Sequence, residues 1–400
     1  MKHILCSLFV LLLAVNCIQA EDVPFIELKG HAAWVNFAVY TPDGKKIITA
    51  SMDDTVRLWN AETGEELKKM EVRDGLLRAS AFTPDRKRMV ATGRVARMLA
   101  FELGEELQVI QIARIPDDAY ISPDGSKIAS TVWSPEDKLY GQLWDAETGR
   151  ESHRLAVPGI SVYQGAFSPD GKKIVMRLAD NTAVIWDTES GNALHILRGH
   201  TNTISTIDFS PDGTKIITGN SGRIADKYYS HGVNFFRIWD VESGKELHKF
   251  TVLQGGSGSA EFSPDGKKLV TTSGSTAQGR GSFARITDTR IWDTESGKEL
   301  QKLTGAEGFI VFSPDGKKIV TGGEGHTAVV WDAESGKELQ RLQGNPDSRA
   351  SVGNYFISLM SYDPKVSSIT FSPDGKRVVT ASNDGSVRVW DISAIMEDKQ

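Results

Sequence analysis

The sequence predicts an all-β protein that folds as one closed ring of four-stranded antiparallel sheets, and three observations lead to this class. A turn phrase, TPDG or SPDG, recurs along the whole chain. A second phrase with an acidic turn follows each copy, and in most units it contains Trp-Asp, as in IWDTESGKEL at 291–300. Runs of β-branched and aromatic residues separate the phrases. A period of about 40 to 60 residues is typical of one supersecondary unit repeated many times.

The turn phrase occurs eight times, once as TPDR, which predicts eight units. The second unit is the weakest, because Phe101 stands where the others have Trp. The copies lie at 41–44, 83–86, 122–125, 168–171, 210–213, 263–266, 313–316 and 372–375.

Each unit reads as four strands, which we name a to d in chain order. In SVYQGAFSPDGKKIVMRL (161–178), strand a ends at Phe167, SPDG suits a type I turn, and strand b follows. Strand c carries the Trp. ESGK then forms a second tight turn into strand d, where Leu alternates with polar residues. His153, His195 and His248 share one position of strand d, which we expect to face outward as a polar position.

The ends of the chain predict how the ring closes. The last unit stops after strand c, VRVW at 387–390, and has no strand d. The first strand, FIELKG at 25–30, has no unit of its own and matches the d strands. An open ring would leave unpaired strand edges. We therefore expect residues 25–30 to complete the last of eight blades. Seven blades are the alternative, with the second unit merged or displaced.

The amino-acid composition restricts the kinds of partner that the protein can bind. Hydrophobic residues make up 40% of the chain and charged residues 24%, and the formal net charge is −6. Such values are ordinary for a globular protein. Because no stretch concentrates Lys and Arg, we expect no nucleic-acid partner.

The first 20 residues differ from the rest. A charged start, an apolar run from residue 4 to 15 and a small residue at 20 predict a secretory signal peptide. The run is too short to span a membrane, so we expect export to the periplasm or the medium, with no membrane span in the mature chain. An uncleaved anchor is one alternative, and lipidation at Cys17 after a poor lipobox is another. The predicted domains are a signal peptide (1–20), the ring (21–393) and a short tail (394–400).

The repeated Trp-Asp pair and the period resemble the WD-repeat β-propeller family, over residues 25–391, and the signal peptide suggests a bacterial, exported type. The resemblance implies a single closed β-propeller that binds other proteins or peptides without catalysis and without a cofactor. It also implies a buried hydrogen-bonded network, whose members here would be His31, Ser51, Asp53, Trp59, Asp180, Trp186, His200, Trp239, Ser382, Asp384 and Trp390.

The predicted binding surface is the ring face that carries the b–c and d–a connections. In a meander the a–b and c–d turns share the other face, and there the repeat is nearly constant. Three long connections depart from it, at 220–236, 273–289 and 345–365. They are rich in Tyr, Phe and Arg, which are favoured at binding hot spots. The predicted protein-binding residues are Arg223, Tyr228, Tyr229, His231, Phe235, Arg280, Phe283, Arg285, Arg349, Tyr355, Phe356 and Tyr362.

Other interpretations remain open. The long connections could be neutral insertions that cover blade edges, and Trp133 and Tyr140 are smaller binding candidates on the same face. An enzyme is the alternative function, either a quinoprotein-like dehydrogenase or a propeller hydrolase. The DAESGKELQ turn (332–340) resembles quinoprotein repeats but lacks the Trp that follows it there. A His, Ser and Asp set could also mimic a catalytic triad. Two isolated histidines, His231 and His326, do not predict a metal site.

Overall fold

The structure is a computed structural model that describes residues 23–396 with internal gaps. The gaps are 72–78, 83–87, 93–95, 101–105, 111–118, 136–137, 221–233, 253–257, 280–281, 323–326 and 345–365. The predicted signal peptide at 1–20 therefore lies outside the described residues. Among these, no helix is long and apolar enough to cross a membrane.

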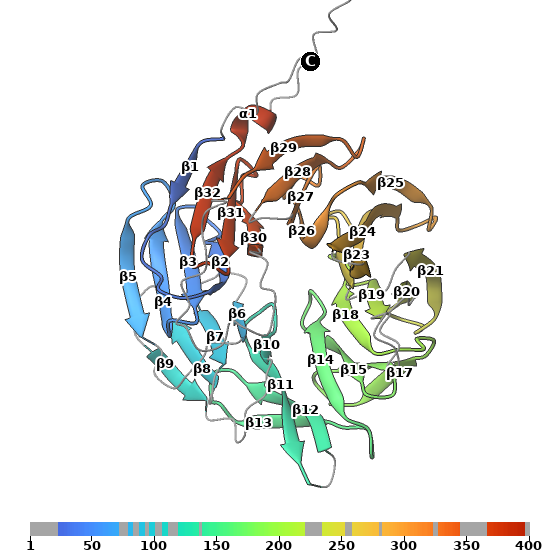
Figure 1. The fold of residues 1–400 in the computed structure, drawn as a ribbon. Helices are drawn as coiled ribbons and strands as arrows, with labels where there is room; N and C mark the ends of the chain where they lie inside the picture. The colour runs from blue at the N-terminus through green and yellow to red at the C-terminus, as the bar shows by residue number, and fades with distance from the viewer. Residues whose placement is uncertain are drawn as a thin grey trace, which may run out of the picture.

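The described residues form eight four-stranded antiparallel sheets arranged around a common axis (Figure 1). Each of the first seven sheets is a consecutive meander, so strands a to d follow one another in the chain. The weak second unit also forms its own sheet. This arrangement is a β-propeller, and the predicted all-β class is confirmed.

The strand bounds of the first four sheets follow in chain order. They are β2 (Val35–Tyr40), β3 (Lys46–Ser51), β4 (Thr55–Asn60) and β5 (Glu66–Glu71); β6 (Ala79–Phe82), β7 (Arg88–Thr92), β8 (Ala96–Ala100) and β9 (Glu106–Ile110); β10 (Ala119–Ile121), β11 (Lys127–Ser134), β12 (Lys138–Asp145) and β13 (Glu151–Leu155); β14 (Val162–Phe167), β15 (Lys173–Leu178), β16 (Ala183–Asp187) and β17 (Ala193–Leu197).

The last four sheets continue around the ring. They are β18 (Ile204–Phe209), β19 (Lys215–Asn220), β20 (Asn234–Asp240) and β21 (Glu246–Val252); β22 (Gly258–Phe262), β23 (Lys268–Gly279), β24 (Ser282–Asp293) and β25 (Glu299–Leu303); β26 (Glu307–Phe312), β27 (Lys318–Gly322), β28 (Ala328–Asp332) and β29 (Glu338–Leu342); β30 (Val366–Phe371), β31 (Arg377–Ser382) and β32 (Val387–Asp391), with β1 (Phe25–Glu27).

The eighth sheet joins the two ends of the described chain. Its order is β1-β32-β31-β30, and Phe25 pairs antiparallel with Trp390. The Leu28 amide continues this ladder by donating to the Val387 carbonyl at 2.9 Å. The first strand thus occupies the strand d position of the last unit, as its sequence predicts. The segment predicted as a tail begins with a short helix, α1 (Ser393–Met396), whose Ile395 packs against the eighth sheet.

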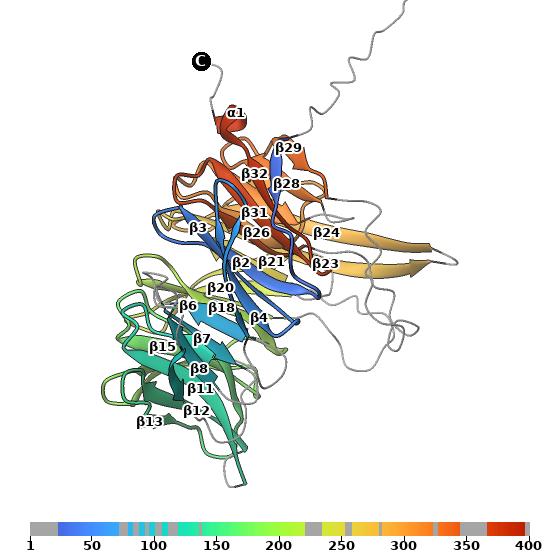
Figure 2. The same cartoon turned by 90° about the vertical axis from the view of Figure 1, so that its left-hand side faces the viewer.

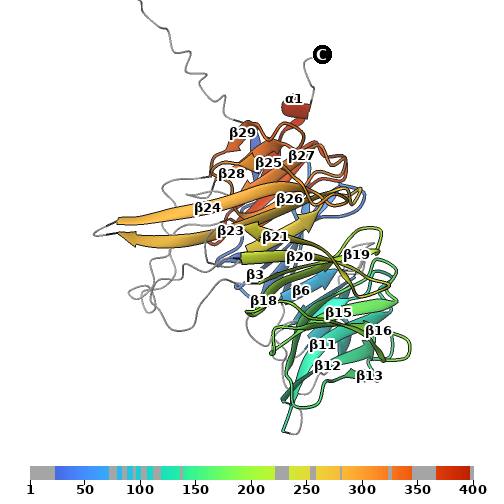
Figure 3. The same ribbon diagram turned by 90° about the vertical axis from the view of Figure 1, so that its right-hand side faces the viewer.

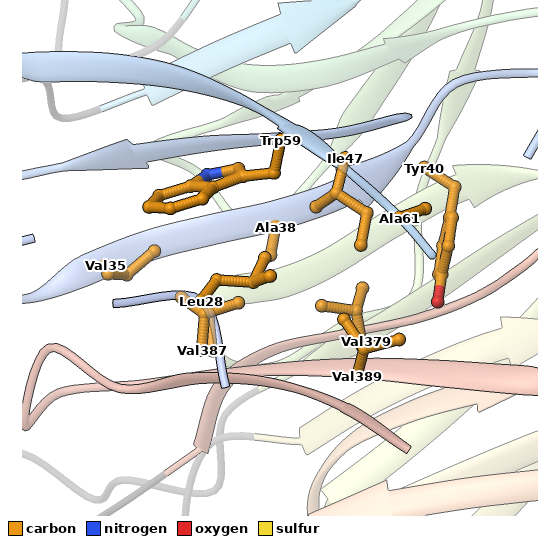
Figure 4. Packing of buried hydrophobic residues seen from close by; sticks show 11 residues of the cluster. Leu28, Val35, Ala38, Tyr40, Ile47, Trp59, Ala61, Val379, Val387 and Val389 are labelled. Atoms are coloured by element: carbon orange, nitrogen blue, oxygen red, sulfur yellow. The ribbon is translucent and has the colours of Figure 1, made fainter. Parts of the chain in front are cut away.

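Apolar side chains on the sheet faces pack between neighbouring blades. Figure 4 shows the cluster between the eighth and first sheets, where Leu28 from the β1 segment contacts residues of both. Comparable buried clusters join the third sheet to the fourth and each later sheet to the next. Burying these faces is the main favourable term in assembling the ring.

The repeated phrase has a structural role that one copy illustrates. The Ser313 hydroxyl donates to Asp315 Oδ1, and the Lys317 amide donates to the same oxygen at 3.0 Å. The chain then needs a positive φ, and Gly316 supplies it at 70° because it has no Cβ. The phrase therefore builds the a–b turn and starts strand b.

The strand d position predicted to face outward instead connects neighbouring blades, so that prediction is wrong. His195 Nε2 lies 2.7 Å from the Glu242 carbonyl oxygen, and His248 Nε2 lies 2.9 Å from that of Glu295. Both carbonyls belong to the c–d turn of the next sheet. The sequence pattern shows strand d as an edge, but in the ring the next blade covers this part of it.

Candidate functional site

The first sheet contains a chain of buried hydrogen bonds that begins at Trp59. The Trp59 indole N–H donates to Thr49 Oγ1 at 2.8 Å, and Thr49 Oγ1 lies 2.6 Å from His31 Nε2. His31 Nδ1 lies 2.9 Å from Asp53 Oδ2. One tautomer satisfies every member, in which Thr49 donates to Nε2 and the Nδ1–H donates to Asp53.

The surroundings favour a neutral histidine beside an ionised aspartate. Burial lowers the pKa of His31 and outweighs the Asp53 carboxylate, which acts in the opposite direction. Burial alone would raise the pKa of Asp53, but hydrogen bonds from Thr55, the Ala32 amide and His31 hold it at about 2. The network is thus fully paired at neutral pH.

The network has the residue types of a catalytic triad, but its hydroxyl is not accessible to a substrate. Thr49 occupies the nucleophile position, yet its side chain is fully buried and its oxygen already bonds both Trp59 and His31. A nucleophile must reach its substrate. The arrangement therefore holds the blade together, which is the structural role that the resemblance implied.

The hydroxyl that links His31 to Trp59 is Thr49, not the predicted Ser51. Both project from the same face of β3 because they are two residues apart, which is why the sequence pattern does not separate them. Ser51 instead donates to the Ala33 carbonyl at 3.1 Å and accepts from the Asp53 amide.

The predicted network members of the fourth and eighth sheets also act locally. Asp180 accepts hydrogen bonds from the amide and hydroxyl of Thr182, which shapes its b–c turn. Asp384 accepts from Ser386 in the same way. Ser382 is buried, and its carbonyl accepts from the Gly385 amide within this turn. These aspartates order turns, whereas Asp53 also binds a histidine.

Other blades share the inner half of the network, which is the hydrogen bond from the Trp indole. In five further sheets the Trp indole donates to a hydroxyl on strand b. In the fourth sheet Met176 stands in the hydroxyl position, and Trp186 Nε1 is buried with no partner among the described residues. The acceptors in the five sheets are Ser130, Thr218, Thr271, Thr321 and Thr380.

The fifth sheet repeats the histidine of the network. His200 Nε2 and the Trp239 indole both lie 2.7 Å from Thr218 Oγ1. Burial, with the charges of Arg237 and Lys249, lowers the pKa of His200 to about 4. The b–c connection that would carry an aspartate, residues 221–233, lies outside the described residues.

Most of the predicted binding residues also lie outside the described part of the chain. Phe235 is described: it is half-buried on β20, and Lys249 Nζ lies 4.1 Å from its ring centroid. Phe283 and Arg285 lie on β24, where the backbone is described. Those outside the described residues are Arg223, Tyr228, Tyr229, His231, Arg280, Arg349, Tyr355, Phe356 and Tyr362.

The segment predicted as a long connection at 273–289 is largely regular strand. β23 and β24 run for 12 residues each and pair from Lys268↔Asp293 to Gly279↔Ser282. We call residues 274–279 and 282–287 the β23–β24 arm. It projects well beyond the other blades on the b–c side (Figures 2 and 3). The chain continues both strands rather than forming a loop, and the two strands pair residue by residue from Lys268↔Asp293 to Gly279↔Ser282.

The base of the β23–β24 arm is held by polar contacts. The hydroxyls of Thr272 and Thr289 lie 2.7 Å apart. Thr289 also donates to the Ala306 carbonyl at 3.0 Å, and Arg290 Nε donates to Asp288 at 2.9 Å. The arm therefore leaves the ring from a fixed base.

The two smaller candidates lie on a second, shorter hairpin. Trp133, the residue before the last of β11, is 48% exposed, and Tyr140 lies on β12. The Arg154 guanidinium lies 4.0 Å from the centroid of the Tyr140 ring, a cation–π contact within the blade. Tyr140 is thus partly engaged, whereas Trp133 presents apolar surface.

Two carboxylates at the inner edge of the ring were not predicted as site residues. Asp208 and Glu261 directly precede the Phe that ends strand a, where other units have Val39 or Val311. Glu261 Oε1 accepts from the Phe312 amide of the next sheet at 3.3 Å. Burial raises the pKa of Glu261 to about 8, with a smaller contribution from the charge of Asp208. An acidic residue at a repeat position that is uncharged in the other units is the signal that could have identified them.

We expect Glu261→Gln to stabilise the protein at pH 8 but not at pH 5. The raised pKa means that the folded protein holds a proton that the unfolded chain releases, so the free energy of unfolding falls as pH rises from 4.5 to about 8. Gln keeps the acceptor for the Phe312 amide without the charge, and a gain of about 1 kcal/mol is expected. Thermal midpoints at both pH values measure it, with the exposed Glu189→Gln as control. An equal gain at both pH values would contradict the assignment.

No group of three or more His, Cys, Asp or Glu suited to hold a metal ion occurs among the described residues.

Comparison with known proteins supports the repeat assignment. Four segments match the model of the WD domain, G-beta repeat: residues 23–60, 191–225, 297–332 and 356–391. The chain therefore contains WD repeats, and the first matched segment includes both β1 and the His31 network.

Curated relatives match only in part. The Ribosome biogenesis protein BOP1 homolog of Arabidopsis thaliana is 34% identical over 123 residues, which is 30% of this chain and 16% of that protein. The Serine-threonine kinase receptor-associated protein of Gallus gallus is 27% identical over 158 residues, 39% of this chain and 43% of that protein. The chain thus matches less than half the length of each relative.

One solved structure matches nearly the whole chain. The computationally designed Ika8 protein gives a TM-score of 0.68 and covers 92% of this chain and 98% of its own, at 19% identity. At this identity the likeness concerns the fold alone.

Proposed function

We propose that the protein is a non-catalytic WD-repeat scaffold that is exported from the cytoplasm and binds partner proteins on its b–c and d–a face. The repeats support the general role, because WD-repeat proteins typically bind other proteins. The buried His31 network supports a non-catalytic role, because its hydroxyl is inaccessible. The predicted signal peptide at 1–20 supports export.

The β23–β24 arm is the main reason for proposing that partners bind on the b–c and d–a face. β22 pairs with β23 only as far as Ser273, and β25 pairs with β24 only from Thr289 inward. Within the described residues, no other strand pairs with either edge of the arm. Both edges therefore present backbone N–H and C=O groups along about 20 Å, at 3.3 Å per residue.

Unpaired strand edges of this length favour the addition of a strand from a partner protein. A two-stranded hairpin is marginally stable in water, and proteins usually cover or shorten exposed edges. An extended segment of a partner that adds to one edge would pair these backbone groups, as in other cases of β-strand addition. The predicted aromatic and Arg side chains of the neighbouring connections would then provide specificity.

We expect removal of the β23–β24 arm to abolish partner binding while the fold stays intact. The variant joins Ser273 to Asp288 by an Asn-Gly turn, which leaves the polar contacts at the base in place. A photo-crosslinking residue at Ala277 in the full-length protein should capture a partner in cells. The same residue at Glu189, on the opposite turn face, is the matched control.

Two results would contradict the proposal. Crosslinks of equal yield from Glu189 would show that the face is wrong. Unchanged captured partners in the arm-deleted variant, with an unchanged thermal midpoint, would show that the arm is not the binding element. Sequencing the N-terminus of the purified protein tests export separately, since cleavage of the predicted signal leaves Glu21 first.

A further inference from the structure

A cavity of about 620 Å³ lies where the first and last sheets meet, on the face that carries the a–b and c–d turns. This is the face opposite the proposed protein-binding surface. The a–b turns of both sheets line the cavity, together with Asn60 and Glu62 of the first sheet and Asp391 and Ser393 of the last. Its volume is within the range of small-molecule sites.

The way the ring closes explains why this seam differs from the others. Each other sheet whose c–d turn is described continues from strand c through a tight turn into its own strand d. In the eighth sheet the chain instead passes from β32 into α1, and β1 arrives from the other end of the chain. The seam therefore lacks one c–d turn, and the cavity is lined by the ends of β32 and α1 instead.

A buried hydroxyl without a partner lines the cavity. Tyr40 ends strand a of the first sheet, is 2% exposed, and its hydroxyl makes no hydrogen bond to the described residues. The same position holds Phe209, Phe312 and Phe371 in other sheets, so packing does not require the hydroxyl. Leaving a buried hydroxyl unpaired costs about 1–3 kcal/mol, which a bound polar group would recover.

Three carboxylates that line the cavity are fixed by their own turns. Asp43 accepts from the hydroxyl of Thr41, Asp374 from that of Ser372, and Asp391 from Ser393. These bonds all use Oδ1, and Oδ2 of each aspartate has no hydrogen-bond partner among the described residues. A hydrogen bond from the neighbouring hydroxyl lowers the pKa of Asp43 and of Asp391, so both carry a negative charge at neutral pH.

Three cationic side chains also line the cavity, and two of them can move more freely than the aspartates. Lys45 and Lys376 are exposed, so their flexible stems can turn toward solvent. Arg377 is held because its Nη1 donates to the Ala61 carbonyl at 3.1 Å across the seam. The fixed charges of the lining are therefore three carboxylates and one guanidinium, and the neutral Tyr40 lines the same cavity.

We propose that this cavity binds a cationic nitrogen group, an ammonium or guanidinium, which donates hydrogen bonds to the free aspartate oxygens and to Tyr40. The group belongs either to a free amine or to a Lys or Arg side chain of a peptide. Preorganised carboxylates bind such a group without rearrangement of the turns.

Calorimetric titration of the full-length protein with agmatine tests the site. Binding is expected, and Tyr40→Phe should weaken it about tenfold, the effect of losing one hydrogen bond. Asp374→Asn should weaken it further, whereas Asp315→Asn, the same turn position in the seventh sheet and outside the cavity, should not. An acetylated Gly-Arg-Gly amide, compared with its citrulline analogue, distinguishes a peptide source from a free amine.

The thermal midpoint of the protein without ligand provides a second test, which does not depend on measuring binding. Without ligand, Tyr40→Phe should not lower the thermal midpoint, because other blades carry Phe there. A lowered midpoint would show that the hydroxyl is already satisfied within the protein. Binding of succinate in place of agmatine, equal agmatine affinity in Tyr40→Phe, or no binding of either cationic probe would each overturn the proposal.

Discussion

Deletion of residues 21–30 is expected to lower the midpoint of thermal unfolding by roughly 5 to 10 °C. The deletion removes β1 and leaves the edge of β32 unpaired from Val387 to Asp391. It also removes Leu28, which is 1% exposed in the cluster between the first and last sheets. Loss of a buried Leu costs about 2–5 kcal/mol, and the lost ladder bonds add about 1 kcal/mol each.

A pair of point variants separates packing from strand pairing. Leu28→Ala should account for about 2–5 kcal/mol of the loss, because it opens a cavity at the seam. Leu67→Ala, on strand d of the first sheet, is the matched control because 46% of its side chain is exposed. Differential scanning calorimetry measures all three proteins. An unchanged midpoint after the deletion would show that β1 does not join the ring.

Thr49→Val is expected to reduce the free energy of unfolding by about 2–4 kcal/mol. Val matches the shape of Thr but removes the hydroxyl that connects Trp59 to His31. Two buried groups, the indole N–H and His31 Nε2, then lack a partner. Urea denaturation monitored by Trp fluorescence measures the change.

The same substitution in the last sheet provides the control. Thr380 bonds only the Trp390 indole, so Thr380→Val should cost about 1–2 kcal/mol, roughly half as much. Equal losses for the two variants would show that His31 contributes nothing to the network. The fourth sheet already tolerates one unpaired indole, because Met176 stands where the hydroxyl would be.

Features within one blade could be predicted from sequence because they are local. The alternation of side chains along β3 placed a hydroxyl on the face of Trp59, and the repeated Asp-Gly placed the turns. The same alternation could not choose between Thr49 and Ser51, which share that face. Only the position of the His31 ring relative to β3 decides between them.

Features between blades could not be predicted in this way. The strand d position of His195 looks solvent-facing in a single unit, and its contact with the Glu242 carbonyl exists only once the next blade is in place. The β23–β24 arm was missed for a different reason: Gly and Ser in residues 273–282 favour turns, and pairing with the opposite strand overrides that preference.

The sequence by itself determined the repeat, the turns, the all-β class and the strand that completes the last sheet. Each of these depends on short-range chemistry or on counting strands. The tertiary structure decided what happens where residues far apart in the chain meet, as at Ser367 and Val35, 332 positions apart and hydrogen-bonded across the seam. The cavity beside Tyr40 arises at that seam, because it depends on how two distant turns pack and not on the residues of either turn alone.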